Sequence, residues 1–286
     1  MDLSSRKPIL SKDNVFEISD EVLDKLRSIL KARKGFNLSQ YKDKCIKRRI
    51  AIRIRATQSA TAEAYGDLLL QDGSELDTLL EVLTIHVSEF FRNPATYAKL
   101  TNEIFPYLFN LCKQESKNSL NLWSVGCAGG EEPYSLALIM KDTFPEETTR
   151  VNCYIHATDV SDSVLKVAAK GIYGSERLKS LPRLLKSRYF TFCGGNYQLL
   201  PEIMELVNFE QSDLYCTESY PKSDMIMCRN VLIYFEQKQQ AKIIKGFVDA
   251  LPSGGILVLG KSENLLGETR KPFQTICPVE RIYRKI

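Results

Sequence analysis

The sequence has few residues of the kinds that build metal sites and disulfide frameworks. It contains only two histidines, His86 and His156, and its eight cysteines include no Cys-x-x-Cys pair. Scattered cysteines are typical of a reducing compartment, and these residues form no familiar metal-ligand spacing. We therefore expect no bound metal.

Long hydrophobic runs are also missing. No apolar stretch approaches the roughly 20 residues that are needed to span a bilayer. The first residues, MDLSSRKPILSKDN, lack the apolar core of a secretory signal. Together with the cysteine pattern, these absences lead us to expect a cytoplasmic protein.

The chain as a whole carries no large excess of charge. Its net charge is only +4, so a basic function must come from a local cluster. The densest basic run is KDKCIKRRIAIRIR, residues 42–55, which contains Arg48, Arg49, Arg53 and Arg55. Three interpretations remain open for it: a surface for an acidic partner, a surface for nucleic acid, or an ordinary solvated helix face.

Two regions of the chain differ in their hydrophobic pattern. Residues 17–100 place apolar side chains at helical spacing, and we assign the ambiguous IAIRIR stretch to a helix as well. From residue 120 onward, the short apolar runs NLWSVG, CYIHATD, DMIMCRN and GGILVLG alternate with helical segments. This alternation predicts an α/β domain with a mainly parallel, Rossmann-like sheet.

The same patterns predict the domain organisation. We expect a helical N-terminal domain over residues 1–92, a linker over 93–118 and the sheet domain over 119–286. Aromatic-rich runs on either side of Gly194-Gly195-Asn196 predict a small antiparallel β-subdomain inserted at about 186–208. The final run, FQTICPVERIYRKI, predicts a closing hairpin.

The stretch NLWSVGCAGGEEPYSLAL, residues 121–138, places a glycine-rich turn between a strand and a helix. In open α/β sheets, such a turn lets the backbone approach a ligand. This turn, which includes Gly126, does not match the dinucleotide fingerprint, and no phosphate-binding lysine follows it. Two acids, Glu131 and Glu132, come after it instead.

Polar residues also follow the other predicted strands. Asp159 ends the HATD run, Asp213 follows FEQS, and Arg229 and Asn230 follow DMIMC. The carboxyl ends of parallel strands meet at one edge of a sheet, so we expect these groups to converge on one crevice. Asp159 is placed to accept hydrogen bonds from two ribose hydroxyls; alternatively, it caps a helix that begins near Ser161.

A ligand with a ribose, positive charge and no phosphate fits this combination. S-adenosylmethionine is such a ligand, because its sulfonium and its ammonium are both cations. Glu131 would pair with the ammonium or shape the pocket. Either acid would also complement the N-terminus of the following helix, and for Glu132 we favour that explanation.

The stretches SEFFRN, NLWSVGCAGGEEPYSLAL, HATDVS and CRNVLIYF, in this order, resemble those of the CheR-type chemotaxis receptor methyltransferases. The likeness extends over nearly the whole chain. It implies transfer of a methyl group from S-adenosylmethionine to glutamate side chains on chemoreceptor cytoplasmic helices, with S-adenosylhomocysteine as the product. By motif match, the cofactor site would be lined by His86, Ser88, Arg92, Gly126, Glu131, Asp159, Asp213, Leu214, Arg229 and Asn230, with Tyr234 near the transferred methyl group.

The chain departs from the family at two places. The family usually reads Asn-x-Thr before FFR, whereas this chain has His86-Val87-Ser88, so Ser88 keeps the hydroxyl and the contact at His86 is in doubt. The inserted hairpin is shorter than in members that grip a C-terminal receptor pentapeptide, so we expect that tether to be absent. We further expect a monomer that reaches the membrane only through its receptor.

The implied chemistry suits the residues present. A glutamate is already ionised at neutral pH, so no general base is required, and the sequence shows no Ser–His or Cys–His pair. Catalysis would rest on alignment in a dry site. Arg92 would anchor the methionine carboxylate or else steer the substrate carboxylate, and Tyr234 would contact the substrate or else belong to the core.

The residues disfavour two other functions, methylation of nucleic acid and non-catalytic signalling. Amino-methyltransferases of DNA and RNA typically carry an Asp- or Asn-Pro-Pro-aromatic run where this chain reads CRNV, residues 228–231, so we expect no nucleic-acid substrate. A non-catalytic signalling module that binds S-adenosylmethionine is disfavoured by the presence of Arg92, Asp159 and Tyr234.

Overall fold

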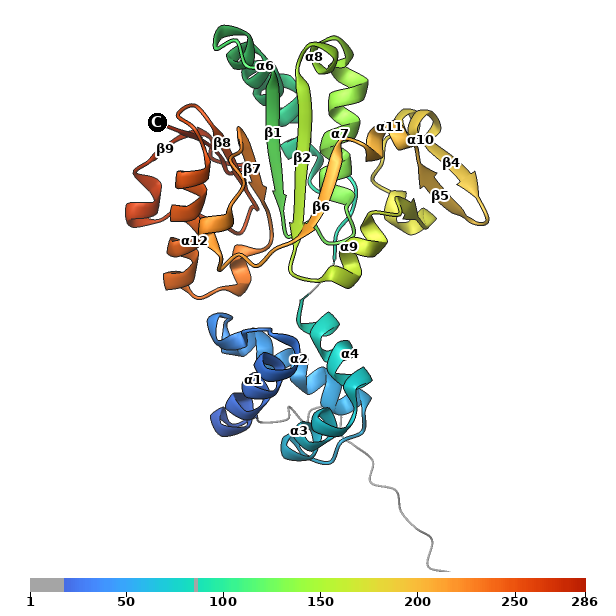
Figure 1. The fold of residues 1–286 in the computed structure, drawn as a ribbon, viewed down its shortest axis with the longest axis vertical. Helices are drawn as coiled ribbons and strands as arrows, with labels where there is room; N and C mark the ends of the chain where they lie inside the picture. The colour runs from blue at the N-terminus through green and yellow to red at the C-terminus, as the bar shows by residue number, and fades with distance from the viewer. Residues whose placement is uncertain (1–17, 85–86) are drawn as a thin grey trace, which may run out of the picture. The chain divides into compact units, whose positions relative to one another are not determined.

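The computed structural model describes residues 18–84 and 87–286. The chain divides into two compact units, Met1–Leu83 and Thr84–Ile286, and each is described by itself (Figure 1). Within the described ranges, no helix combines the length and the apolar character that crossing a bilayer requires.

The first unit is all-α, as the sequence predicts. Its helices are α1 (Asp20–Lys34), α2 (Asp43–Ala56), α3 (Ala62–Gln71) and α4 (Gly73–Leu83). The IAIRIR stretch lies within α2, which confirms its assignment to a helix. Ser19 caps α1 by accepting a hydrogen bond from the Val22 amide, and Gly35 ends it in the left-handed conformation. The buried faces contribute Leu23, Leu26, Leu30, Ile50, Ile54, Tyr65, Leu69 and Leu79 to the core.

The second unit is built on a seven-stranded sheet with the order β6-β2-β1-β7-β8-β10-β9. The strands are β1 (Ser119–Val125), β2 (Asn152–Asp159), β6 (Val207–Gln211), β7 (Met225–Cys228), β8 (Ile256–Leu259), β9 (Phe273–Cys277) and β10 (Ile282–Lys285). All neighbouring pairs are parallel except those that β10 makes with β8 and β9. This arrangement confirms the predicted Rossmann-like sheet and its closing hairpin.

Helices cover both faces of this sheet. Side chains of α6 (Phe105–Gln114) and α7 (Glu131–Thr143) share a core with Leu120 and Leu122 of β1. The opposite face of β1 presents Trp123, which packs against Phe247 of α12 (Gln237–Ala250) with ring centroids 5.5 Å apart. The shorter helices are α5 (Pro94–Lys99), α8 (Pro145–Arg150), α9 (Asp162–Ala168), α10 (Arg183–Tyr189) and α11 (Pro201–Met204).

The structure differs from the linker that we expected over residues 93–118. This segment is helical, with α5, a π-helical turn at Leu100–Ile104 and α6 in succession. Asn93 adopts φ +62° and Pro94 occupies the first turn of α5, so the Asn-Pro pair begins a helix instead of interrupting one. The segment therefore belongs to the sheet domain, whose core holds its apolar side chains.

The β-subdomain forms a separate antiparallel sheet with the order β3-β5-β4. Its strands are β3 (Ile172–Tyr173), β4 (Phe190–Cys193) and β5 (Asn196–Leu199), and the β4–β5 pair forms the predicted hairpin. The expected bounds of about 186–208 therefore miss β3. They also reach into β6, which pairs with β2 in the main sheet.

Candidate functional site

The ends of the central parallel strands lie level with one another. Val125 of β1 is in register with Thr158 of β2 and with Cys228 of β7. The next residues along each strand therefore emerge at the same edge of the sheet. This edge carries the polar groups that the sequence predicts, and we refer to it as the strand-end site.

The turn after β1 requires glycine. Gly126 has φ +66°, and a Cβ atom there would lie 2.6 Å from Cγ2 of Val231. A Cβ at Gly129 would lie 2.8 Å from Oε2 of Glu131 and 2.9 Å from Nη1 of Arg177. Both positions keep the backbone close to neighbouring groups that a larger residue would displace.

Asp159 ties the end of β2 to this turn. Its carboxylate accepts hydrogen bonds from the Ala128 amide at 3.0 Å and from the Ser161 amide at 3.1 Å. The second bond is the contact that the helix-cap alternative requires, since Ser161 is the N-cap of α9. A carboxylate is also the kind of acceptor that a pair of ribose hydroxyls requires.

Glu131 is fully buried and forms an ion pair with Arg177. Its other oxygen, Oε2, has no hydrogen-bond partner within the described residues. Arg177 lies in a 3₁₀ turn at Ser175–Leu178, far along the chain, and no sequence pattern predicts this pairing. A buried carboxylate oxygen without a donor is suited to a ligand's ammonium group.

Glu132 lies in the first turn of α7, where it complements the N-terminus of the helix, and it has side-chain partners that the sequence does not predict. Its carboxylate accepts a hydrogen bond from the Ser124 hydroxyl at 2.9 Å and lies 3.7 Å from Nη1 of Arg229. Only 13% of its side chain is exposed. Burial raises the pKa of Glu132 to about 7, and the positive charges of Arg229 and Arg92 act in the opposite direction.

Arg229 is buried between several polar groups. Its Nη2 donates a hydrogen bond to Oδ1 of Asn93 at 2.6 Å, and its guanidinium lies 5.8 Å from the centre of the Tyr97 ring. Among described residues, its Nε and Nη1 atoms have no hydrogen-bond partner, and neither does the Tyr97 hydroxyl. Three donors are thus left for a ligand or for water.

The loop after β7 is fixed by a residue that sequence reasoning missed, Glu263. Its carboxylate accepts the amides of Asn230, Val231, Leu232 and Gly260 at 2.6–3.0 Å. Burial raises the pKa of Glu263, and these backbone donors oppose that effect. Asn230 adopts φ +62° here, and Tyr234 follows, half-buried, at the end of a 3₁₀ turn at Leu232–Tyr234.

Asp213 and Leu214 lie in the turn after β6. The Asp213 carboxylate accepts the Tyr215 amide at 3.0 Å, and burial raises the pKa of Asp213. The Leu214 carbonyl accepts a hydrogen bond from the Tyr220 hydroxyl at 2.6 Å. Both residues therefore have defined backbone or side-chain contacts at the fourth strand end.

The SEFFRN stretch enters the sheet domain through its two phenylalanines, which are buried. Arg92 is half-buried, and its Nη1 donates to the Val87 carbonyl at 3.2 Å. Ser88 is half-buried, whereas His86 lies outside the described residues. The positive charge of Arg92 lowers the pKa of Glu132, so Arg92 belongs electrostatically to the strand-end site.

In the helical unit, the basic run of α2 divides into two sets. Arg49 donates to the Val82 and Leu83 carbonyls at 2.7 and 3.0 Å, and Arg53 forms an ion pair with Glu75. Arg48 and Arg55 are exposed. Arg49 and Arg53 therefore make contacts within their own domain, and partner binding by any of the four arginines proposed for the substrate stays a prediction.

These features fit S-adenosylmethionine. The glycine turn allows close approach, and Asp159 is an acceptor for a ribose. Among described residues, one carboxylate oxygen of Glu131 and two guanidinium nitrogens of Arg229 make no hydrogen bond, although Arg229 Nη1 lies in an ion pair with Glu132. In the parts of the chain that the structure describes, no three His, Cys, Asp or Glu side chains gather as metal ligands would. The fold and the site define an S-adenosylmethionine-dependent methyltransferase.

Comparison with known families agrees with both units. The family model for the CheR methyltransferase, SAM binding domain, matches residues 86–280, and the model for the CheR methyltransferase, all-alpha domain, matches residues 21–84. The chain belongs to the CheR methyltransferase family.

Individual relatives span much of the chain. A chemotaxis protein methyltransferase of Listeria innocua is 36% identical over 83% of this chain and 88% of its own length. A chemotaxis protein methyltransferase of Borreliella burgdorferi is 30% identical over 91% of this chain and 93% of its own length. An uncharacterized 104.1 kDa protein of Rhodobacter capsulatus is 31% identical over 93% of this chain, which spans only 28% of that longer protein.

Proposed function

We propose that this methyltransferase esterifies glutamate side chains on the cytoplasmic helices of chemoreceptors. The observation that carries the proposal is the strand-end site itself, in which the charged groups around the glycine turn, among the residues that the structure describes, include no histidine. The one described histidine, His156, lies in β2 opposite Trp123 and not at the strand ends. A carboxylate nucleophile needs no base at neutral pH, whereas an amine nucleophile must first lose a proton.

The residues of the chain would share the work as follows. Asp159 would hold the ribose, and the unpartnered oxygen of Glu131 would accept the ammonium group. Arg92 would anchor a carboxylate, and the rigid loop held by Glu263 would position Tyr234. The bound cofactor supplies an electrophilic methyl group and leaves as a neutral thioether.

The electrostatics of the site favour this reaction. The attacking carboxylate and the sulfonium carry opposite charges that disappear as the methyl group transfers. A site that excludes water favours such a change, and fixed geometry contributes up to about 7–11 kcal/mol. The chain therefore needs to align the reactants and does not need a covalent intermediate.

The test is transfer of tritium from labelled S-adenosylmethionine to membranes that contain chemoreceptors. We expect label in the receptor band, released as methanol by mild base, because carboxyl esters are base-labile and methylated amines are not. Receptors with their candidate glutamates changed to alanine serve as the control and should take up no label. Base-stable label would refute a glutamate substrate, and cofactor binding without any transfer would support the non-catalytic alternative.

The partner's binding mode follows from the same proposal. The β-subdomain is small, with strands of two to four residues. We propose that it does not bind a C-terminal receptor pentapeptide. Removing the C-terminal pentapeptide from a receptor should then leave its methylation rate unchanged. A marked fall in the rate would show that the tether exists.

A further inference from the structure

A row of lysines runs along one face of α12. Lys238, Lys242 and Lys245 are all exposed, and their spacing places them one above another on the helix surface. None of the three makes an ion pair or a hydrogen bond with residues 18–84 or 87–286. The opposite face buries Ile243, Ile244 and Phe247 against the sheet, so the helix itself is firmly held.

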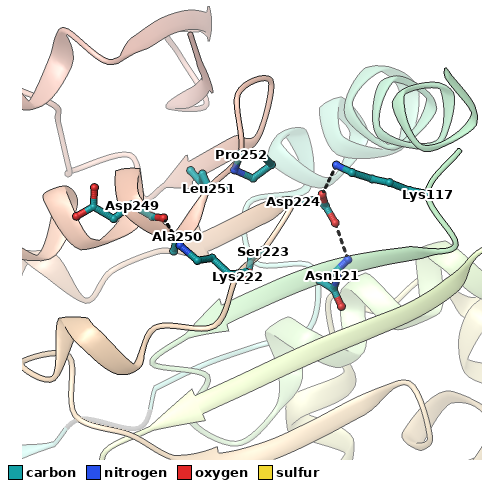
Figure 2. A pocket seen from close by; sticks show the side chains of 9 residues that line it. All are labelled: Lys117, Asn121, Lys222, Ser223, Asp224, Asp249, Ala250, Leu251 and Pro252. Carbon is teal, nitrogen blue, oxygen red and sulfur yellow. Dashed lines mark hydrogen bonds and ion pairs between the residues drawn. The ribbon is translucent and has the colours of Figure 1, made fainter. Parts of the chain in front are cut away.

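Two lysines of the row border one hollow in the surface, and a second hollow lies next to it. The first is a cavity of about 430 Å³, whose walls include Lys242, Lys245, Thr217 and Tyr220. The second, of about 300 Å³, lies beyond the end of α12 and is shown in Figure 2. Both hollows are lined by Lys222, Asp249 and Ala250, so they adjoin one another, and we refer to the two together as the groove.

Figure 2 shows which charged side chains of the second hollow already have an ion-pair or hydrogen-bond partner. Lys117 contacts the Asp224 carboxylate, and Lys222 donates to the main-chain carbonyl of Asp249 at 2.7 Å. A main-chain carbonyl does not neutralise the charge of Lys222. The groove therefore keeps the positive charges of Lys222, Lys242 and Lys245, moderated by Glu218 and Asp249.

The lysine row starts close in sequence to the predicted reaction centre. Tyr234 ends the turn after β7, and α12 begins three residues later at Gln237. The first lysine of the row, Lys238, is therefore close in sequence to the residue predicted to lie near the methyl group. The other end of α12 lies at the opposite edge of the sheet, near Asn121 in the first half of β1.

We propose that the lysine row of α12 is a docking surface for the acidic, helical methylation region of the substrate receptor. This inference rests on the proposed function. A receptor helix lying along α12 would place acids spaced by one or two turns opposite the lysines. Its next acid would then lie near Tyr234, where the reaction is expected.

The shape of the charge distribution favours a long acidic partner over a small phosphate ligand. The Lys238–Lys245 spacing corresponds to roughly 10 Å along a helix, since each residue advances about 1.5 Å. The lysines thus form a line, whereas a phosphate site needs donors that converge on one point. Glu218 and Asp249 beside the groove would also repel a compact polyanion.

The test compares two double variants of the full chain that change the charge equally. Lys242→Glu/Lys245→Glu alters the row, and Lys113→Glu/Lys170→Glu alters two exposed lysines elsewhere on the same domain, which also lack partners in the described structure. Receptor methylation is measured over a salt series, and affinity for S-adenosylhomocysteine is measured by calorimetry. Poly-L-glutamate and inorganic pyrophosphate are added as competitors.

We expect the row variant to raise KM for the receptor about tenfold at low salt, with kcat and cofactor affinity unchanged. Its KM should depend less on salt than that of the wild type, because exposed charges act over about 8–10 Å at moderate ionic strength. Poly-L-glutamate should inhibit the wild type more than the row variant. The control variant should behave as the wild type.

Three results would overturn the docking surface. These are equal KM values and salt slopes for the row variant and the wild type, an equal effect of the control variant, and stronger inhibition by pyrophosphate than by poly-L-glutamate. Failure of the proposed function is distinct, because in that case the wild type itself would not methylate the receptor at any salt concentration.

Discussion

Arg53 tests whether the basic run of α2 serves the fold or a partner. Its Nε and Nη2 atoms form hydrogen bonds of 2.9 and 2.5 Å with the two carboxylate oxygens of Glu75. The Tyr65 hydroxyl donates to the same carboxylate at 2.7 Å. Glu75 is 7% exposed, and its hydrogen bond is the main cause that raises the pKa of Arg53. We predict that Arg53→Ala destabilises the helical unit.

The magnitude follows from the burial of the pair. Removing one partner of a buried ion pair leaves the other charge uncompensated and destabilises a protein by about 3–5 kcal/mol. Arg53 keeps 18% of its side chain exposed, so we expect the lower end, about 3 kcal/mol. Domains of this size change their melting temperature by roughly 4–8 °C for each kcal/mol, so the effect should exceed 10 °C.

The assay uses the position of the single tryptophan. Trp123 is the only tryptophan of the chain, and it is buried in the sheet domain. Its fluorescence therefore reports unfolding of that domain, while circular dichroism at 222 nm reports the helices of both. In a urea titration of Arg53→Ala, ellipticity should be lost at lower urea than in the wild type, and the fluorescence transition should not move.

Arg48 supplies the matched control. It lies on the same helix, is exposed, and has no ion-pair or hydrogen-bond partner within the part of the chain that the structure describes. Arg48→Ala should leave both transitions within about 0.5 kcal/mol of the wild type. The triple variant Arg53→Met/Glu75→Leu/Tyr65→Phe should recover much of the lost stability, because apolar replacement removes both buried charges and the hydroxyl that donates to Glu75.

A change below about 1 kcal/mol in Arg53→Ala would refute the reasoning, since it would show that the pair is not buried in solution. The result also decides how substrate binding is tested. If Arg53 holds the domain together, reduced methylation by an Arg53 variant says nothing about a docking surface. Charge reversal at Arg48 then becomes the informative substitution in α2.

Three further predictions concern the sheet domain. Asp159→Ala should weaken binding of S-adenosylhomocysteine by about 1.5–3 kcal/mol, as measured by calorimetry in excess EDTA. An unchanged affinity would leave Asp159 as a helix cap. Loss of binding by the wild type in EDTA would show that the site needs a metal. Tyr234→Phe should leave that affinity unchanged and lower kcat for receptor methylation; an equal kcat would assign Tyr234 to the core. Glu132→Gln should flatten the pH dependence of the stability of the sheet domain. The pKa of Glu132 is about 7 in the folded chain and 4.5 in the ordinary case, so the folded state keeps this proton to a higher pH than the unfolded state does. The free energy of unfolding of the wild type therefore falls by up to about 1.4 kcal/mol per pH unit between pH 4.5 and 7. Urea titrations followed by Trp123 fluorescence at pH 5 and 7.5 measure this, and identical pH slopes for the two proteins would contradict it.

The strand ends could be predicted from the sequence because each depends on local pattern alone. NLWSVG, HATD and DMIMCRN each show an apolar run that stops at a small or polar residue. Parallel pairing then brings Gly126, Asp159 and Arg229 to one edge whatever the intervening helices do. The same locality explains why the helices of the first unit were assigned correctly.

The linker was misjudged because polar composition and an Asn-Pro pair are ambiguous signals. KQESKNS, residues 113–119, covers the end of α6 and the start of β1, and only residues 115–118 form a turn between them. The preceding residues carry Leu100, Ile104, Phe105 and Leu108 at helical spacing, and these side chains enter the main core. A proline in the first turn of a helix is favourable, so Pro94 marked a beginning where we expected a break.

The partners of the charged groups could not be predicted, because they come from segments that only the tertiary fold brings together. Arg177 reaches Glu131 from a turn in the β-subdomain region, and Glu263 reaches the loop after β7 from the segment after β8. Neither residue belongs to a pattern that marks it out. Hydrogen-bond satisfaction of buried groups is a property of the whole fold, and single-sequence periodicity does not contain it.

These partners explain why acids follow the glycine turn. Glu131 is balanced by Arg177 and Glu132 by Arg229, so the strand-end site buries charges of both signs. A polyanionic ligand such as a dinucleotide would face two carboxylates at the turn. A ligand that carries an ammonium and a carboxylate can instead meet the unpartnered oxygen of Glu131 and an arginine. The glutamates are thus a selective feature of the turn, since they favour a zwitterionic ligand over a phosphorylated one.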